Sequence, residues 1–187
     1  RKAVVRDPQE IAEEAARVFS AEDRGTFFIG SELVSIAPGR AVVRLKICAH
    51  HLNSAKVCHG GFVFALADSA LGFASCSHGI QTLAQHADIH WLKPGREGDV
   101  LTASAGEVSR SGRTAVYDIA VTNQEGALVA TVRGMTRSTG LPVARRSWRT
   151  PASLSRSRPE TEPSRCTSST WSFRMKQRAK ARLLKSC

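Results

Sequence analysis

The segment that most restricts how this chain can fold is residues 58–74, CHGGFVFALADSALGFA. From Phe62 to Cys76 the sequence contains no proline and one glycine, and its many alanine and leucine residues favour a helix over a strand. The run is apolar nearly all round, which is typical of a helix buried inside a domain. Asp68 lies in the middle of it, and a buried carboxylate is costly unless it is paired or functional. We therefore expect one long buried helix whose single acid has a role.

The segments around this helix predict the rest of the fold. Residues 8–20 carry apolar side chains at helical spacing, and residues 31–48 form two alternating runs that Pro38-Gly39 can join as a hairpin. Four later runs, bounded by turn residues, are typical of strands: 82–92, 100–111, 113–123 and 127–138. This order predicts an α+β domain over residues 1–140, in which one antiparallel sheet wraps around one long central helix.

The composition changes after residue 140. Residues 141–187 contain 12 Lys and Arg against 2 acidic residues, whereas residues 1–140 contain 15 against 14. The net charge of +11 therefore resides almost entirely in a basic tail, rich in Ser, Arg and Pro, that we expect to be disordered. Because the main body is nearly neutral, the overall charge does not indicate a nucleic-acid-binding fold, and we expect no nucleic-acid partner. Whether the tail has any function is left open.

Other features exclude several classes of protein. No apolar run approaches ~18 residues without a charge, so we expect no membrane span. Acidic residues interrupt the first 19 positions, which argues against a signal peptide, and five cysteines without paired spacing favour a reducing compartment. We therefore expect a cytoplasmic protein.

His86, Asp88 and His90 have the chemistry of iron ligands, but the two histidines would be ~13 Å apart on a strand, so we expect no metal.

Two stretches resemble a known family. Residues 51–74, HLNSAKVCHGGFVFALADSALGFA, and residues 88–105, DIHWLKPGREGDVLTASA, resemble the hotdog-fold acyl-CoA thioesterases, most closely the phenylacetic-acid-degradation type. The shared pattern is an Asn, then HGG, then a helix containing L-A-D-[ST]-A, then L-[KR]-P-G followed by G-D. The resemblance covers most of residues 8–140. It implies a hotdog fold and hydrolysis of aryl-acetyl-CoA or medium-chain acyl-CoA to a free acid and coenzyme A, which is part of the substrate, so no cofactor is expected.

The chemistry assigns roles to three of these residues. A thioester hydrolase must polarise a carbonyl, and free N–H groups at a helix N-terminus suit that task. Gly60 is the candidate N–H donor and Gly61 a candidate substrate contact, because glycine lets a substrate approach the backbone closely. Asp68 would act as a general base on water or as a nucleophile, and the sequence does not decide between them. A non-hydrolytic acyl-CoA-binding module is the alternative function, although such a module would not need the acid.

The spacing of these residues predicts an oligomer. Gly60 and Asp68 are eight residues apart, which is ~12 Å along one helix and too far for both to reach one thioester carbon. If both act, Asp68 must meet Gly60 of another chain across a two-fold axis, with two equivalent sites. The resemblance implies the same homodimer, and a dimer of dimers, hence a homotetramer.

The remaining candidates have supporting roles. Asn53 would orient the attacking water or the thioester, or else cap its loop. His59 would support the oxyanion or the loop, and Ser69 would hydrogen-bond the substrate or Asp68. The phosphates of coenzyme A require cations. The candidate cations are Lys56, Lys93, Arg96, Arg110, Arg113, Arg133 and Arg137, and the favoured contacts are Lys93 and the stretch Arg110-Ser111-Gly112-Arg113.

Overall fold

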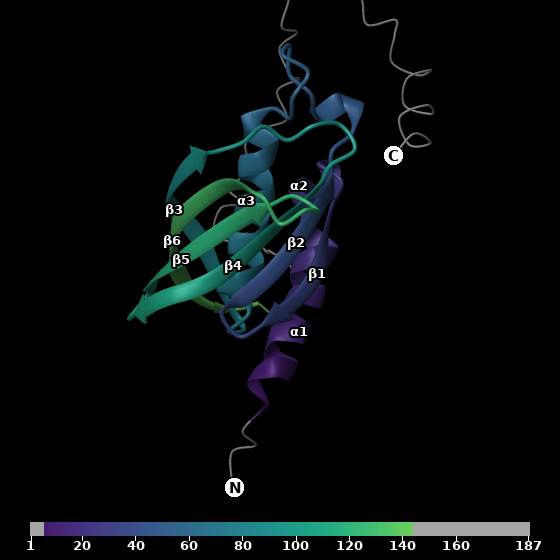
Figure 1. Ribbon diagram of the computed structural model, residues 1–187. Coiled ribbons are helices and arrows are strands. Elements are labelled where there is room, and N and C mark those ends of the chain that lie inside the picture. The colour runs from purple at the N-terminus through teal and green to yellow at the C-terminus, as the bar shows by residue number, and fades with distance from the viewer. Residues whose placement is uncertain (1–5, 144–187) are drawn as a thin grey trace, which may run out of the picture. The chain divides into compact units, whose positions relative to one another are not determined.

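The computed structural model describes residues 6–143 of the chain. Its helices are α1 (Pro8–Glu22), α2 (Arg24–Phe28) and α3 (Gly60–Cys76), with one 3-10 turn at Ala49–His51. Its strands are β1 (Ser31–Ala37), β2 (Arg40–Lys46), β3 (Ile80–Trp91), β4 (Val100–Ser111), β5 (Thr114–Thr122) and β6 (Leu128–Pro142). The strands form one antiparallel sheet of six in the order β1-β2-β4-β5-β6-β3. Figure 1 shows this sheet curving around α3, with α1 beside β1.

Most elements agree with the sequence expectations. The first helix, the hairpin that turns at Pro38-Gly39, the central helix and the four later strands all occur, with ends shifted by a few residues. The strand β6 continues to Pro142, beyond the boundary expected at residue 140. The basic tail lies outside the described residues, so its disorder stays a prediction.

The helix α2 was not expected from the sequence. It has five residues, and its N-cap residue is Asp23, whose Oδ1 accepts the Thr26 N–H at 3.0 Å. So short a segment shows no helical periodicity, and its position next to α3 comes from tertiary contacts. Two large side chains of α2, Phe27 and Phe28, are exposed in the single chain.

The core lies between α3 and the concave face of the sheet. Leu66 and Leu71 of α3 are buried against strand residues such as Tyr117 and Ile119. Each such side chain contributes roughly 1.5–3 kcal/mol when removed from water. The closest approach is at Gly134 of β6, where an added Cβ would lie 2.5 Å from Leu71 Cδ2. Glycine at this position therefore lets the strand pass directly over the helix.

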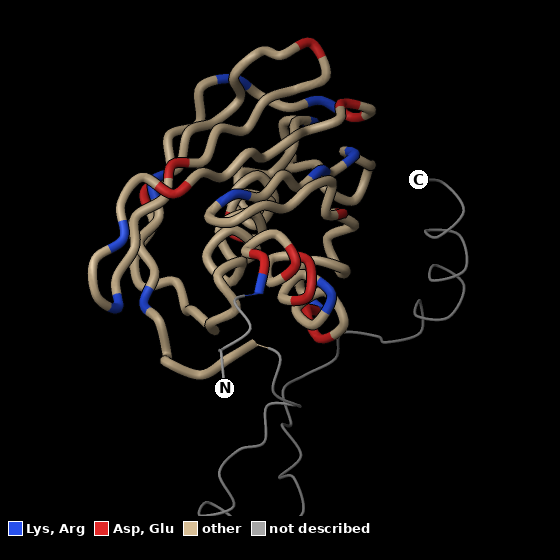
Figure 2. Tube along the Cα trace, turned by 90° about the horizontal axis from the view of Figure 1, so that it is seen from below, with Lys and Arg blue, Asp and Glu red and all other residues tan. Residues whose placement is uncertain are grey.

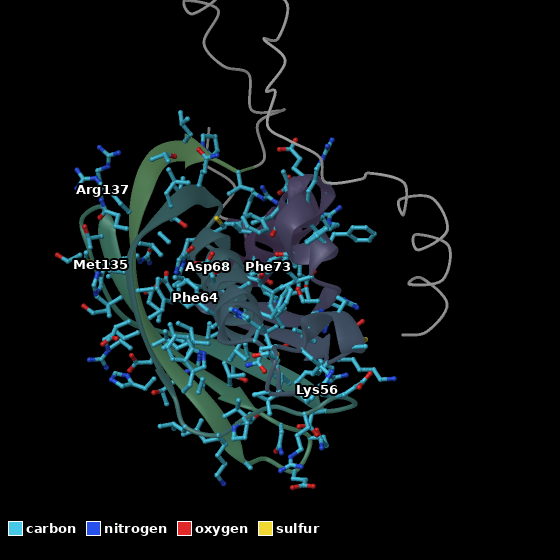
Figure 3. All side chains as sticks on the ribbon, turned by 90° about the horizontal axis from the view of Figure 1, so that it is seen from above. Lys56, Phe64, Asp68, Phe73, Met135 and Arg137 are labelled. Atoms are coloured by element: carbon cyan, nitrogen blue, oxygen red, sulfur yellow. The ribbon has the colours of Figure 1, made fainter. Side chains whose placement is uncertain are left out.

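One face of α3 is not covered in the single chain, which corrects the expectation of a helix buried all round. Asp68 and Gly61 are exposed, and Phe64 and Ala65 are partly accessible. Figure 3 looks down α3 and shows Asp68 and Phe64 on the same side of the helix, with Phe73 on the other. The sheet surrounds only part of the helix, and α1 packs along the flank where Phe73 meets Phe19. Asp68 is thus an acid on an open helix face, not a buried one.

Candidate active site

The backbone N–H of Gly60 is free at the N-terminus of α3 within the described residues. His59 is the N-cap residue, and its Nδ1 accepts the Gly61 N–H at 3.0 Å. The His59 carbonyl accepts the Phe62 N–H at 2.9 Å. Among residues 6–143, nothing accepts the N–H of Gly60. This N–H lies at the positive end of the helix dipole, which is the arrangement that stabilises an oxyanion.

This arrangement separates the roles of the two glycines. The N–H of Gly61 is used in the cap, so it is not available to a substrate as the sequence suggested, although its exposed backbone still permits close approach. His59 supports the helix start through its side chain, in line with the supporting role expected for it. Gly60 supplies the free donor.

The side chain of Asn53 shapes the loop before α3. Asn53 Oδ1 accepts the N–H groups of Ala55 at 2.9 Å and Val57 at 3.3 Å. This oxygen therefore caps the loop, which is the second of the two roles expected for Asn53. Its amide nitrogen has no acceptor within the described part of the chain and remains able to donate. Asn53 can therefore both shape the loop and offer one N–H to a water or a thioester.

His51 fixes this loop against α2 and was not identified from the sequence. It is buried; its Nδ1 accepts the Cys48 N–H at 2.9 Å and its Nε2 lies 3.0 Å from the Ile29 carbonyl. Burial and the charge of His50 lower the pKa of His51, so the ring stays neutral and keeps both bonds. Its carbonyl accepts the His59 N–H at 2.8 Å, which ties the loop to the start of α3.

Asp68 is the acid of the site. Its side chain is accessible in the single chain, yet surrounding protein atoms restrict its hydration, and this desolvation, followed by the nearby charge of Asp23, raises its pKa. It makes no hydrogen bond to any residue between 6 and 143. A carboxylate whose pKa is raised and whose oxygens are unengaged is suited to accept a proton from water.

Ser69 does not pair with Asp68, which corrects one of the expectations for it. Its Oγ lies 3.0 Å from the Ala65 carbonyl oxygen and 2.8 Å from Thr26 Oγ1, and its single proton is donated to one of these two oxygens at a time. The Thr26 hydroxyl in turn donates to Asp23. This chain joins α3 to α2 and holds Asp23 near the acid. The sequence does contain a signal for the capping role of Asp23, because Asp is a preferred N-cap residue and its side chain accepts the N–H three residues later, here that of Thr26.

The candidate cations lie at two ends of the molecule. Lys93 follows Trp91 at the end of β3, next to the start of α3. Arg113 lies at the turn between β4 and β5, where its Nε donates to the Ser138 carbonyl at 2.9 Å. Because β3 runs from one end to the other over 12 residues, these groups are roughly 36 Å apart along the strand direction. The single chain therefore does not bring the expected coenzyme A contacts together.

Arg110 and Gly112 share the far end with Arg113. Arg110 Nε lies 3.5 Å from Glu107 Oε1, and His78, just past the end of α3, places Nε2 2.7 Å from Glu107 Oε2. Burial would raise the pKa of Glu107, but hydrogen bonds from Tyr117 and His78 and the nearby positive charges outweigh it, so the pKa is lowered. Figure 2 shows that Lys and Arg are scattered over the described part of the chain in this view.

Gly60 and Asp68 lie on one uninterrupted helix, α3, as the sequence argument required. Eight residues of helix separate them by ~12 Å, so they cannot act on one carbon within a single chain.

Comparison with known proteins identifies the family. The thioesterase superfamily model matches residues 55–130, from the loop before α3 into β6. Over 112 residues the chain is 39% identical to acyl-coenzyme A thioesterase PaaI of Escherichia coli, covering 60% of this chain and 80% of that protein. The chain belongs to the thioesterase superfamily. The predicted site residues of this thioesterase from His59 to Arg113 fall within the matched region, and Asn53 lies two residues before it.

Solved structures confirm the hotdog fold of this thioesterase. The E. coli PaaI protein from the phenylacetic acid degradation operon superposes with a TM-score of 0.71 at 34% identity, covering 73% of this chain and 99% of that one. A hypothetical thioesterase of Streptococcus pneumoniae, solved with coenzyme A, gives a TM-score of 0.59 at 32% identity, covering 62% of this chain and 93% of that one.

Proposed function

We propose that this thioesterase hydrolyses acyl-CoA thioesters to a free carboxylic acid and coenzyme A. The observation that carries the proposal is the free N–H of Gly60 at the N-terminus of α3, next to a glycine-lined backbone that a thioester can approach. The similarity to acyl-coenzyme A thioesterase PaaI and to a thioesterase solved with coenzyme A supports the choice of substrate.

The geometry suggests a sequence of steps. The thioester oxygen accepts the Gly60 N–H, and the charge that develops on it as the tetrahedral intermediate forms faces the helix dipole. Asp68 of a second chain takes a proton from water while the water oxygen attacks the carbonyl carbon. The carbon–sulfur bond then breaks, and the proton passes to the thiolate of coenzyme A. Attack by the Asp68 carboxylate itself, with an anhydride hydrolysed by water, remains the alternative route.

We infer that a homodimer completes the site. The open face of α3 carries Asp68, and β3 is an edge strand of 12 residues that no other described strand covers on its outer side. Exposed edge strands favour pairing with another chain. Antiparallel pairing of two β3 strands would bring the start of β3 in one chain, with Arg110 and Arg113 nearby, toward Lys93 and Gly60 of the other. This would gather the cations that a single chain separates. The dimer of dimers remains an expectation.

The acyl group is the least defined part of the proposal. An aryl-acetyl or medium-chain acyl group is favoured, because the similar E. coli protein comes from the phenylacetic acid degradation operon.

None of the helices in the described part of the chain has the length and apolar character needed to span a membrane. Coenzyme A esters as substrates agree with the cytoplasmic location expected from the sequence.

A pair of substitutions at Gly60 tests the proposal. Gly60 is the first residue of α3 and follows an extended residue, His59, so proline fits the backbone there but removes the N–H. The variant Gly60→Ala keeps the N–H and adds the same Cβ. We expect Gly60→Pro to lower kcat at least ~100-fold relative to Gly60→Ala in a free-thiol assay over a panel of acyl-CoAs. Equal kcat values for the two variants would show that this N–H does not bind the oxyanion.

The same assay decides between an enzyme and a binding module. If the wild-type protein binds coenzyme A but releases no thiol from any acyl-CoA in the panel, the thioesterase proposal fails and the non-hydrolytic module remains.

A further inference from the structure

An indole ring lies against the start of α3. Trp91, at the end of β3, donates its Nε1–H to the Gly60 carbonyl at 3.2 Å. A Cβ added to Gly60 would lie 3.0–3.3 Å from three atoms of this indole. The glycine at residue 60 therefore lets the ring lie close against the backbone, and it is not needed for a positive φ angle, which Gly60 does not have. Trp91 and Gly60 form one unit built from two elements far apart in sequence.

Trp91 completes the set of bonds that hold the first turn of α3. The His59 carbonyl and side chain engage the N–H groups of Phe62 and Gly61. The indole engages the Gly60 carbonyl, and the Gly60 N–H has no acceptor within the described residues. With the groups on either side engaged, the free N–H has a fixed direction. Such preorganisation is what makes an oxyanion donor effective.

The backbone that carries the indole is also fixed. The N–H groups of Leu92 and Lys93, directly after Trp91, both bond to the Val129 carbonyl, at 2.8 and 3.1 Å. The Trp91 side chain is nevertheless 54% exposed. A large ring that is anchored by its N–H and yet presents much of its surface to solvent next to a free backbone donor is suited to contact a ligand bound there.

We propose that Trp91 is a positioning residue of the active site, whose N–H fixes the start of α3 and whose exposed ring forms a wall for the thioester and the adjoining pantetheine arm. This inference rests on the proposed thioesterase function. It predicts two separable effects, one on catalysis through the N–H and one on binding through the ring.

Two variants separate these effects. Trp91→Phe keeps an aromatic ring but removes the N–H, and should lower kcat about fivefold, the factor that corresponds to one typical hydrogen bond, with KM nearly unchanged. Trp91→Leu also removes most of the wall and should raise KM roughly three- to tenfold in addition. Leu92→Ala is the matched control, because Leu92 is the next residue and is equally exposed, at 54%, so its kcat and KM should stay at wild-type values.

Fluorescence gives a readout that does not depend on turnover. The chain has three tryptophans, at positions 91, 148 and 171. In a Trp148→Phe, Trp171→Phe background, coenzyme A should change the emission of Trp91 in a saturable way. An active wild-type enzyme with an unchanged kcat in Trp91→Phe, or with no fluorescence response to coenzyme A, would overturn the inference about Trp91. Absence of any wild-type turnover would instead overturn the thioesterase proposal and the role of Trp91 with it.

Discussion

Asp68 depends on its neighbour Asp23 for part of its basicity. Desolvation is the larger cause of its raised pKa, and the charge of Asp23 adds to it. Asp23→Asn removes that charge, and Asn is as good an N-cap as Asp, so α2 should persist. A base acts in its deprotonated form, so activity is lost as the pH falls through its pKa. Lowering the pKa of Asp68 should therefore move the acid limb of the kcat/KM profile to lower pH.

A pH–rate profile of the wild type, Asp23→Asn and Glu22→Gln checks this prediction. Glu22 is the neighbouring exposed acid and is not among the causes of the shift at Asp68, so its variant should retain the wild-type limb. An acid limb that stays in place in Asp23→Asn would mean that another group controls it.

At the scale of single residues, the sequence predicts the positions of those residues that a local sequence motif determines. His59, Gly60 and Asp68 belong to one local motif, and the structure places His59 at the N-cap of α3 and the other two on the helix. The partner of Ser69 could not be predicted, because Thr26 reaches it through a tertiary contact between α2 and α3. The exposure of Asp68 was also missed, because an apolar sequence does not show which helix face the sheet leaves open.

At the scale of elements, Gly134 sets how closely β6 approaches α3. A Cβ at this residue would lie 2.5 Å from Leu71 Cδ2, so Gly134→Ala should force the leucine or the strand to move and reduce the free energy of unfolding by about 1–3 kcal/mol. Gly106 of β4 is the matched control, because its added Cβ would meet nothing within 4 Å and its φ is not positive. Gly106→Ala should leave stability unchanged or raise it by up to about 1 kcal/mol.

Urea unfolding of the two variants at neutral pH measures this difference. Equal stability of Gly134→Ala and Gly106→Ala would mean that the helix and strand adjust without strain at their contact.

Elements that carry a strong period or a clear turn were predictable, and the others were not. The hairpin at Pro38-Gly39 and the four strands of the second half follow from alternation and turn residues. The helix α2 is too short to show periodicity, and the end of β6 at Pro142 depends on its pairing with Ile80 of β3. The domain boundary expected at residue 140 from composition stays a prediction.

At the scale of the whole molecule, the central question is which chain supplies each half of the site. The separation of Gly60 and Asp68 on one helix requires two chains if both act on one thioester. The inactive variants Gly60→Pro and Asp68→Asn can then complement each other. A mixed dimer would hold one intact pair, formed by Gly60 of the Asp68→Asn chain and Asp68 of the Gly60→Pro chain.

Unfolding the two variants together in equal amounts and refolding them should therefore restore activity. Random pairing makes half of the dimers mixed, each with one intact site of two, so the mixture should reach about a quarter of wild-type activity. Each variant refolded alone is the control and should stay inactive. A mixture that also stays inactive, while size-exclusion chromatography shows that mixed dimers form, would mean that Gly60 of one chain and Asp68 of the other do not form one site.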